Sequence, residues 1–409
     1  MRSVRFGLAV ILVLSLAVAT ACGKSGDDEG GGVEGGKLQI GAALSLTGSL
    51  AKEGALTKQG YQLCQEKVNQ RGGVKVGDKK AKLAISYSDD KSEPDTAARL
   101  TDTFNDDGIK LILGPYGSPS TEAAAAAVER NGQVMVDSSG ADDNIFTKGY
   151  KNIFAVLSPA TDYVAVIVDS IMESANPKPK TAAMLSADDG FSETAAKGGV
   201  EAAEKAGLQV VAEESFPEHT TDVSSALTKV KGKNPDLILG SVHVEEGIAI
   251  VKQSKELGVQ PQGFGETVAP PTPDFTKALG SSANGVVGST QWTPEVKGRD
   301  EIFGTAKDYA ADFKKRFGTD AEYHSAEAAA ACLALVLAVE DAGSADAGKV
   351  RDSLASLNTE SFFGPIKFDS TGKNVTKPMS AIQIQDGKVV TIYPEDQAQA
   401  ELQWPGASG

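Results

Sequence analysis

The sequence predicts an α/β protein built from two doubly wound, Rossmann-like lobes, and three observations support this prediction. β-rich apolar runs alternate with helical patterns, as in parallel sheets whose strands are joined by crossover helices. The alternation comes in two successive series, separated near Ser158-Pro159. The roughly 370 residues that follow the N-terminal segment also exceed the size at which one hydrophobic core keeps growing. We therefore expect two lobes, each with its own core.

The first series begins with a strand over 38–46 and a helix over 56–71. Apolar or small residues recur along this helix at steps of four and form one buried stripe, which ends at Gly72-Gly73. The rest of the series is predicted as strand 83–87, helix 94–106, strand 110–113, helix 119–131 and strand 134–136.

The second series continues the alternation of strands and helices, whereas the last third of the chain departs from it. The second series is predicted as strand 181–186, helix 191–206, strand 208–213, helix 223–231, strand 237–241 and helix 247–257. The last third is predicted as helices 302–317, 325–342 and 348–357, followed by strands 366–368, 381–384 and 389–393. Because these helices come in a run, we expect them to complete lobes already begun.

The N-terminus has the features of an export signal. Arg2 and Arg5 precede an apolar run over 6–18, which is too short to span a bilayer but has the length of a signal-peptide core. The run leads into Ala19-Thr20-Ala21-Cys22, which resembles the bacterial lipobox, where a lipid is attached to the cysteine. We expect a signal peptide over 1–21.

The segment over 22–37 is predicted to be lipidated Cys22 and a flexible linker, because it is rich in Gly, Asp and Ser. An ordinary Ala-x-Ala cleavage site, which would release the protein, is the alternative.

The charge balance excludes some partners. The chain has 40 basic and 55 acidic residues, a net charge of −15, and removal of Arg2 and Arg5 with the signal makes it −17. Nucleic acid does not suit such a chain. Because the basic residues form no cluster, anionic lipid is not attracted either, and we expect membrane contact through the lipid anchor only.

The loop over 114–121 runs from a predicted strand into a predicted helix. Ser118 stands at the capping position and Pro119 at the first helical position. Backbone N–H groups at such a helix start, with the hydroxyls of Ser118, Ser120 and Thr121, favour binding of a carboxylate. Loops that follow the strands are also where doubly wound sheets bind ligands. A plain helix cap is the alternative.

Several motifs occur in a specific order over 38–393. They are Ile40-Gly41-Ala42-Ala43-Leu44-Ser45-Leu46-Thr47-Gly48, the helix end over 69–73, Asp89-Asp90, the 114–121 loop, Thr147-Lys148-Gly149-Tyr150, Asn234-Pro235-Asp236 and Phe363-Gly364-Pro365-Ile366-Lys367-Phe368-Asp369. In this order they resemble the branched-chain (leucine/isoleucine/valine) amino-acid-binding family of ABC-transporter solute-binding proteins.

The resemblance implies the type I periplasmic-binding-protein fold, in which three crossings join the lobes and hinge closure encloses the ligand. It puts the crossings near Ser158-Pro159, 290–293 and 361–365. Lobe I would then take 38–158 plus 292–360, and lobe II 159–291 plus 361–409.

The resemblance also implies a ligand site. Ser118 takes the place of the residue that holds the ligand's α-carboxylate. Ser138-Ser139-Gly140-Ala141 matches the loop that supplies a backbone carbonyl and amide. Ala141 stands where amino-acid binders have a threonine, and Ser138 or Ser139 could replace that lost hydroxyl. The alternative for this loop is a serine-rich turn.

Lobe II and the last third supply further site residues by the same resemblance. Phe191 takes the place of an aromatic residue that stacks over the ligand, and Glu266 that of the acid that receives its ammonium. His243 and Tyr323 fall in other cleft-lining regions. Phe191 as a helix-start staple and Glu266 as a solvated carboxylate are the alternatives.

Cys64 and Cys332 lie on apolar faces of helices that the resemblance assigns to lobe I, in an oxidising compartment. A disulfide between them and two separate buried thiols both fit the sequence, because spacing alone does not decide pairing.

Enzymatic motifs are absent from the sequence. The three histidines are His219, His243 and His324, and H-E-x-x-H, C-x-x-C, G-x-S-x-G and phosphate-loop patterns do not occur. We expect no enzyme, no cofactor and no metal site.

The expected function is that of a monomeric, lipid-anchored solute-binding protein outside the cytoplasm, which captures a small carboxylate-bearing solute, a branched-chain or related amino acid, for an ABC permease. A ligand-sensing subunit for a membrane receptor is the alternative function. Amides, urea-like compounds and aromatic carboxylates are alternative ligands, because Glu266 favours an amino group whereas Ala141 disfavours the usual way of holding one.

Overall fold

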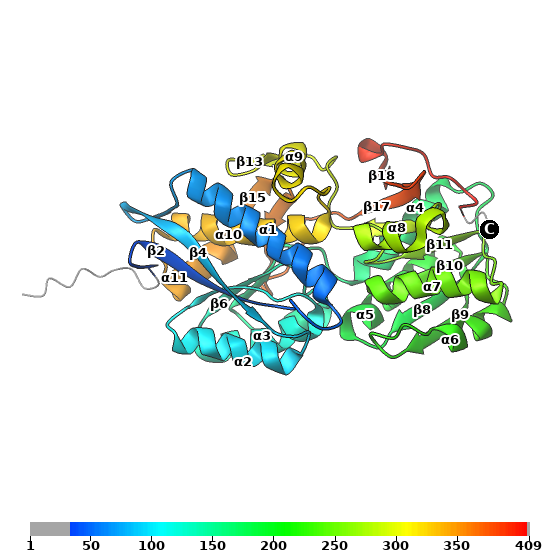
Figure 1. The fold of residues 1–409 in the computed structure, drawn as a ribbon, viewed down its shortest axis with the longest axis horizontal. Coiled ribbons are helices and arrows are strands. Elements are labelled where there is room, and N and C mark those ends of the chain that lie inside the picture. The colour runs from blue at the N-terminus through cyan, green and yellow to red at the C-terminus, as the bar shows by residue number, and fades with distance from the viewer. Residues whose placement is uncertain (1–32, 407–409) are drawn as a thin grey trace, which may run out of the picture.

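A computed structural model describes residues 33–406, which form two α/β lobes side by side (Figure 1). The predicted signal peptide and Cys22 lie outside the described residues. No single described helix is long and apolar enough to cross a membrane, and α10 (Tyr323–Ala342) with α11 (Ala347–Ser356) passes that test only as a pair bent by 109°. Most of α10 is buried inside lobe I.

Lobe I contains a seven-stranded sheet in the order β3-β4-β2-β5-β6-β7, with β1 paired to β2. The pairings are parallel except β1 with β2 and β3 with β4. The strands are β1 (Val33–Glu34), β2 (Lys37–Leu44), β3 (Val74–Val76), β4 (Lys79–Asp89), β5 (Leu111–Leu113), β6 (Val134–Asp137) and β7 (Ile153–Ala155).

Helices cover both faces of this sheet, as alternating strands and helices predict. One face packs against α1 (Ala51–Gln70), α9 (Ala306–Phe317), α10 and α11. The other face packs against α2 (Pro94–Asp106) and α3 (Ser118–Asn131), with the short helix η1 (Asp143–Thr147) nearby.

Lobe II contains a second seven-stranded sheet in the order β18-β17-β12-β11-β10-β8-β9. Its first two strands run antiparallel and the others are parallel. The strands are β8 (Thr181–Ala187), β9 (Gln209–Phe216), β10 (Leu237–Ser241), β11 (Gly263–Glu266), β12 (Val287–Thr290), β17 (Ser380–Gln385) and β18 (Lys388–Tyr393).

Helices again cover both faces of the sheet. One face packs against α4 (Thr161–Ser174) and α5 (Gly190–Ala206), and the other against α6 (Ser224–Lys231), α7 (Val244–Leu257) and α8 (Pro273–Leu279). The remaining short elements are η2 (Gly280–Ala283), β13 (Arg299–Asp300), β14 (Gly304–Thr305), β15 (Asn358–Ser361), β16 (Gly364–Lys367) and η3 (Glu395–Gln397).

Helices α4 and α8, strands β11 and β12, and the short helix η2 of lobe II are missing from the sequence prediction. Helix α4 is buried along most of its length, so it lacks the polar face that marks an amphipathic helix. Strands β11 and β12 have four residues each, which is too short for a clear alternation.

The chain crosses between the lobes at three adjacent segments, and side chains tie these together. The amide of Gln291 accepts the Ser158 N–H at 3.0 Å and donates to the Ser158 carbonyl at 3.1 Å. The Ser158 hydroxyl donates to the Lys377 carbonyl at 2.8 Å, and Lys377 Nζ donates to the Gln291 carbonyl.

The third crossing lies later in the chain than the predicted 361–365. Phe362, Phe363 and Ile366 are buried in the core of lobe I, and the Trp292 indole N–H donates to the Phe362 carbonyl at 2.9 Å. The chain stays beside β7 as far as Asn374, whose side-chain amide donates to Val156. Lobe I therefore takes 361–374 as well, because these aromatic side chains are buried there.

The predicted linker also ends earlier than residue 37. Val33 and Glu34 form β1, which pairs with β2 in register with Leu38 and Lys37. Val33 packs against the core of lobe I, and burial of this apolar side chain explains why the strand forms.

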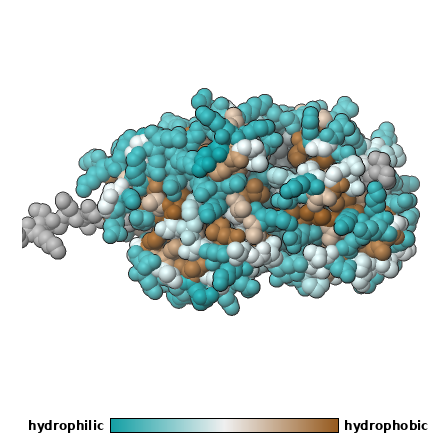
Figure 2. Space-filling view, viewed as in Figure 1, coloured by the Kyte–Doolittle hydropathy of each residue, from teal (hydrophilic) through white to brown (hydrophobic). Residues whose placement is uncertain are grey.

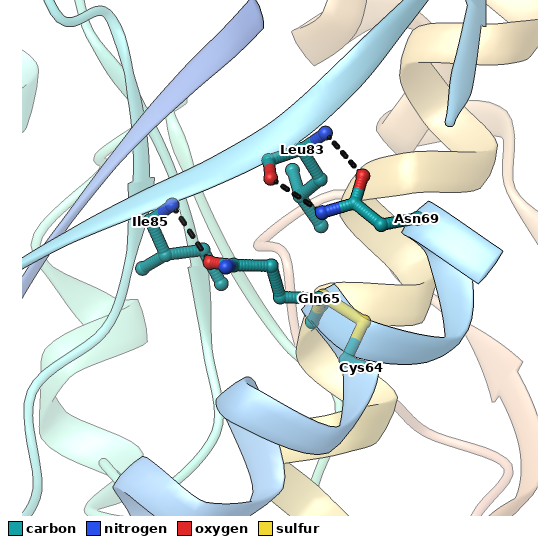
Figure 3. Close-up of a disulfide and its surroundings, with 6 residues drawn as sticks. Cys64, Gln65, Asn69, Leu83 and Ile85 are labelled. Carbon is teal, nitrogen blue, oxygen red and sulfur yellow. Dashed lines mark hydrogen bonds between the residues drawn. A yellow bond between two sulfur atoms is a disulfide. The ribbon is translucent and has the colours of Figure 1, made fainter. Parts of the chain in front are cut away.

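Cys64 on α1 and Cys332 on α10 form a disulfide, so the structure pairs the two thiols whose pairing the sequence left open. Figure 3 shows the bond beside contacts that hold α1 to β4. Asn69 exchanges two hydrogen bonds with the Leu83 backbone, both at 2.8 Å, and Gln65 accepts the Ile85 N–H at 2.9 Å. Helix α1 is thereby fixed to both of its neighbours.

The surface is mainly hydrophilic. Figure 2 shows polar residues over most of one face of both lobes, with hydrophobic residues between them. Among the described residues, the large hydrophobic side chains that are classed as exposed are Val375 and Val389.

Candidate ligand cleft between the lobes

A small cavity lies between the two lobes, where loops that follow the sheet strands meet. Lobe I lines it with residues of the α3 start, the loop after β6 and α10, and lobe II with residues of α4, α5, α7 and the loop after β11. The lining residues are Tyr116, Gly117, Ser118, Ser139, Tyr163, Phe191, His243, Val268, Tyr323, His324 and Glu327. Most of them are aromatic or can form hydrogen bonds, which suits a small polar solute.

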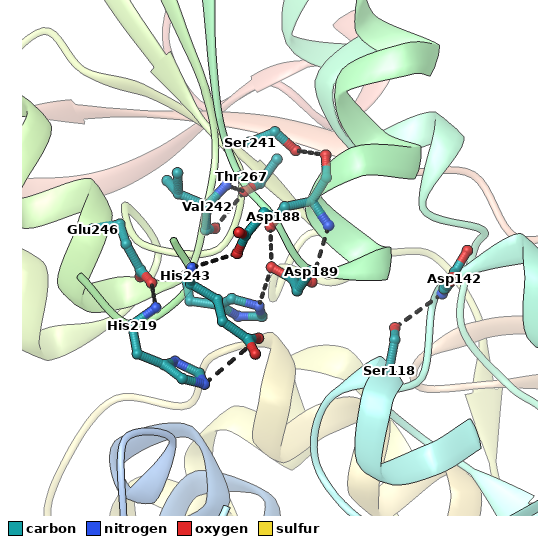
Figure 4. A network of polar contacts seen from close by, with 12 residues as sticks. Ser118, Asp142, Asp188, Asp189, His219, Ser241, Val242, His243, Glu246 and Thr267 are labelled. Atoms are coloured by element: carbon teal, nitrogen blue, oxygen red, sulfur yellow. Dashed lines mark hydrogen bonds and ion pairs between the residues drawn. The ribbon is translucent and has the colours of Figure 1, made fainter. Parts of the chain in front are cut away.

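The start of α3 forms one wall, although the details differ from the sequence prediction. The helix begins at Ser118, and Gly117 takes the N-cap position with φ of 86°, a conformation that favours glycine. The Ser118 hydroxyl therefore does not cap α3. Its oxygen accepts the Asp142 N–H at 3.0 Å, as Figure 4 shows, which leaves its hydrogen as the group that it can donate.

Helix α10 forms a second wall in lobe I. Glu322 caps this helix and accepts from His324 Nδ1 at 2.6 Å, and His324 Nε2 lies 3.3 Å from the Tyr116 hydroxyl. Tyr323 and Glu327 lie four residues apart and therefore share one face of the helix. Both line the cavity.

Lobe II contributes an aromatic and charged wall. Phe191 packs edge-on against Tyr163 with ring centroids 5.0 Å apart, and its centroid lies 5.4 Å from that of His243. His243 Nε2 lies 3.5 Å from Asp189 Oδ2 (Figure 4), and Asp189 also accepts two bonds from Ser192. The pair thus sits at the starts of α5 and α7.

In this His243–Asp189 pair each group favours the ionised form of the other. Burial alone would lower the pKa of His243, but the Asp189 charge raises it to about 9. Burial likewise opposes ionisation of Asp189, yet the His243 charge and the bonds from Ser192 lower its pKa below the usual range. Asp189 compensates the charge of the imidazole on its Nε2 side, while His243 Nδ1 is buried and has no hydrogen-bond partner among residues 33–406. The protonated ring can therefore donate from Nδ1 to an acceptor such as a ligand carboxylate.

Of the nine predicted ligand residues, five line the cavity: Ser118, Ser139, Phe191, His243 and Tyr323. The other members of the Ser138-Ser139-Gly140-Ala141 loop lie behind its wall. Ser138 Oγ lies 2.9 Å from the Tyr61 hydroxyl, Gly140 N–H donates to Asp137 at 2.9 Å, and the Ala141 carbonyl accepts from Ala160. Ser139 is thus the residue of this loop whose side chain lines the cavity. The other three residues form hydrogen bonds within the protein.

Glu266 does not line the cavity, which corrects its predicted role in ammonium binding. It ends β11 opposite Gly240, and its side chain packs against Gly240 and Gly247, beneath α7. Burial raises its pKa well above the usual range. Val268, two residues later, is the residue from this loop that reaches the cavity. Strand register aims the Glu266 side chain at the helix layer.

Six lining residues are absent from the sequence prediction: Tyr116, Gly117, Tyr163, Val268, His324 and Glu327. Tyr116 and Gly117 belong to the 114–121 loop, so the motif itself could have indicated them. Glu327 lies on α10, which is buried on nearly all sides, so the sequence carries no periodicity that marks its cavity face. Tyr163 lies on α4, which the sequence prediction lacks.

The lobes are close together around this cavity. The volume of the cavity is only about 10 Å³, which is about what one water molecule needs. Contacts between the lobes surround it: Lys52 pairs with Glu245 at 3.0 Å, and the Thr194 hydroxyl donates to Asp142 at 2.8 Å. A solute of amino-acid size therefore requires the lobes to move apart.

Larger hollows lie elsewhere on the molecule. One of them, about 730 Å³, lies on lobe II between the end of α7, β11 and the C-terminal segment. It has fewer convergent polar side chains and does not involve lobe I, so we assign the ligand site to the cleft.

Comparisons with known proteins agree with this two-lobed arrangement. A family model described as periplasmic binding protein matches residues 37–388. The chain belongs to the periplasmic binding protein family. The family predicted from the motif order is thereby confirmed, as is the two-lobed fold, and membership implies a place outside the cytoplasm.

Two curated relatives of this periplasmic binding protein come from Brucella. Leu/Ile/Val-binding protein homolog 7 of Brucella melitensis biotype 1 is 24% identical over 383 residues, which cover 90% of this chain and 94% of the relative. Leu/Ile/Val-binding protein homolog 8 of Brucella abortus is also 24% identical over 383 residues, 90% of this chain and 93% of the relative.

Solved structures share the fold of this periplasmic binding protein. The branched-chain amino acid transporter substrate-binding protein LivJ from Streptococcus pneumoniae, in complex with isoleucine, has a TM-score of 0.76 and 23% identity, covering 90% of this chain and all (100%) of that one. A solute-binding protein of an ABC transporter from R. palustris, in complex with benzoate, has a TM-score of 0.74 and 17% identity, covering 90% and 96%.

Proposed function

We propose that this protein is the lipid-anchored binding component of an ABC importer and captures a small carboxylate-bearing solute of the amino-acid class by closure of its two lobes. Closure is the whole of its mechanism, and no covalent bond is made or broken. A solute that contacts both lobes only in the closed form shifts the equilibrium toward that form. The permease then receives the closed shape.

The proposal that the solute has a carboxylate rests on one observation: the start of α3 and the His243 side chain both reach the cavity. Ser118 begins the 14-residue helix α3, whose first backbone N–H groups and dipole favour an anion. The imidazolium of His243, with its pKa of about 9, comes from the opposite lobe. A carboxylate between them would gain contacts in the closed form that the open form lacks.

Aromatic carboxylates are a second candidate class of ligand. Tyr116, Tyr163, Phe191 and Tyr323 all line the cavity, and aromatic walls suit an aromatic ring. The protein from R. palustris with benzoate bound has the same fold.

A thermal-shift panel tests the proposed ligand classes. Leucine, isoleucine and phenylalanine represent amino acids, benzoate represents aromatic acids, and leucinamide is leucine without its carboxylate. At 100 times its Kd a ligand adds about 2.7 kcal/mol of stability, so a true ligand raises Tm by several degrees. We expect at least one carboxylate to do so and leucinamide to have little effect.

A panel in which every carboxylate leaves Tm unchanged would overturn the proposed ligand class. The anchor is tested separately, because the mass of the mature N-terminus differs between a lipidated and an unmodified Cys22.

A further inference from the structure

Glu327 is a buried carboxyl group whose position the stability of the fold does not explain. Its residue is 1% exposed, and it lines the inter-lobe cavity. One oxygen, Oε1, accepts the Ser139 hydroxyl at 3.3 Å. The other, Oε2, is buried and has no hydrogen-bond partner among residues 33–406. Leaving a buried polar atom unpaired costs about 1 to 3 kcal/mol, and such an atom calls for an explanation.

We propose that Glu327 accepts the N–H groups of the bound solute, so that the solute carries an amino group as well as a carboxylate, and that Glu327 rather than Glu266 sets this preference. This inference rests on the proposed function and names the chemistry of the second end of the ligand. Ser118 and Glu327 both belong to lobe I and line the same cavity. The two charged ends of an amino acid would thus be held by one lobe.

The charges around Glu327 favour a cation beside it. Burial, followed by the charges of Glu322 and Asp137, raises its pKa well above the usual range, whereas Ser139 and Lys377 oppose that rise. The charge of Lys377 opposes the rise only in part, because burial lowers the pKa of Lys377 itself to about 7, and its Nζ donates to the backbone carbonyls of Gln291 and Pro378 rather than to the carboxyl group. Glu322 already accepts from His324 Nδ1 and Asp137 from the Gly140 N–H, whereas Glu327 Oε2 has no partner among residues 33–406. An ammonium group of the solute would supply a donor and a positive charge to Glu327.

The aromatic lining fits the same chemistry. Tyr116, Tyr163 and Tyr323 line the cavity with Glu327, and aromatic rings attract cations by about 0.5 to 2 kcal/mol. Glu266 has no such surroundings, because its side chain packs against Gly240 and Gly247 beneath α7 and is not among the cavity-lining residues. Both of its oxygens are buried without a partner in the described part of the chain.

Binding constants of four proteins test the proposal: the unaltered chain, Glu327→Gln, Glu327→Asp and Glu266→Gln. The probes are leucine with its des-amino analogue 4-methylpentanoate, and phenylalanine with 3-phenylpropanoate. We expect Glu327→Gln to weaken binding of the amino acid by roughly 10- to 100-fold, because a hydrogen bond to a charged group is lost, and to leave the des-amino acid almost unaffected. Glu327→Asp keeps the charge and should retain part of the preference.

Glu266→Gln is the matched control, because it makes the same chemical change at a buried carboxyl group outside the cavity. It should leave the preference for the amino acid unchanged. Circular dichroism and thermal melting of each variant separate loss of folding from loss of binding.

Proton release on ligand binding gives a second test. If Glu327 had only a structural role, ligand binding would not release a proton from it. An ammonium ligand favours the ionised carboxylate, so binding should expel a proton from a group whose pKa is raised, and affinity should increase as pH rises toward that pKa. Calorimetric titrations in phosphate and in Tris, which differ in heat of ionisation, detect this proton. The Glu327→Gln variant should release less.

The outcomes separate this inference from the proposed function. If the unaltered protein binds the des-amino acids as tightly as the amino acids, Glu327 has no ammonium to hold and the inference is wrong, whereas the carboxylate-binding function stands. The inference also fails if the full preference survives in Glu327→Gln, whether or not Glu266→Gln retains it. If the unaltered protein binds none of the four probes, the amino-acid function fails and the inference fails with it.

Discussion

Glu266 and Glu327 are two buried carboxyl groups with opposite surroundings. Glu327 faces the cavity and other acids, with Ser139 as its hydrogen-bond donor. Glu266 packs beneath α7, where burial alone raises its pKa. The position of Glu327 suits contact with a ligand. Burial of Glu266 lowers stability, because neither of its oxygens has a hydrogen-bond partner within residues 33–406.

We predict that Glu266→Met stabilises the protein at neutral pH, because an apolar side chain of similar length removes two unpaired buried oxygens. The gain should be about 1 to 3 kcal/mol at pH 7. In the unaltered protein the folded state keeps a proton that the unfolded state loses above its ordinary pKa, so stability falls as pH rises from about 4.5. The methionine variant lacks this loss.

Urea unfolding of both proteins at pH 4 and at pH 7 measures the difference. The variant's advantage should be larger at pH 7. Because all other titrating groups are common to the two proteins, their contributions cancel. An advantage that is equal at both pH values, or a less stable variant, would show that Glu266 has a partner or a role that its packing does not reveal.

A disulfide joins helices α1 and α10, which are far apart in the sequence. Cys64 and Cys332 are 268 residues apart in sequence and bonded in the structure. The bond closes a loop that includes all of the parallel part of lobe II, so it restricts the unfolded chain strongly. Contacts of Asn69 and Gln65 with β4 extend the connection to the sheet.

We predict that reduction of this disulfide lowers the free energy of unfolding by about 2 to 4 kcal/mol. Thermal melting with and without dithiothreitol measures the loss as a lower Tm. The double variant Cys64→Ala/Cys332→Ala is the control, because it should melt at a lower temperature and should not respond to the reductant. A Tm of the unaltered protein that ignores complete reduction, verified by thiol titration, would contradict the prediction.

At the scale of the whole molecule, contacts outside the ligand cavity hold the lobes together. At the start of α1, Lys52 pairs with Glu245 of α7 at 3.0 Å. Next to it, Glu53 accepts the backbone N–H of Val244 at 3.4 Å. Lys52 and Glu53 of lobe I thus contact the start of a lobe II helix, and neither residue lines the cavity. They should favour the closed form with or without a solute.

We predict that Lys52→Ala weakens solute binding by about two- to fivefold, because a partly exposed ion pair contributes up to about 1 kcal/mol. Small-angle X-ray scattering of the solute-free variant should show a larger radius of gyration, as the open form becomes more populated. Lys58→Ala is the matched control, because Lys58 lies over the Tyr87 ring within lobe I. Equal affinity and scattering for Lys52→Ala and the unaltered protein would mean that the pair does not affect closure.

The two-lobed α/β fold and the family could be predicted from the order of residues alone. Alternation of strands and helices is a local property, and the motif order is written directly in the chain. The polar loops that follow the strands also indicated where ligand residues such as Ser118 and Phe191 lie, since topology brings those loops together.

The full set of side chains that face the cavity could not be predicted, because packing between distant segments places them. Helix α10 is buried on nearly all sides, so periodicity could not single out the face that carries Glu327. The β11 register turned Glu266 toward α7, and long-range packing set the third crossing and the Cys64–Cys332 bond. Each of these depends on contacts between segments far apart in sequence, which local spacing does not encode.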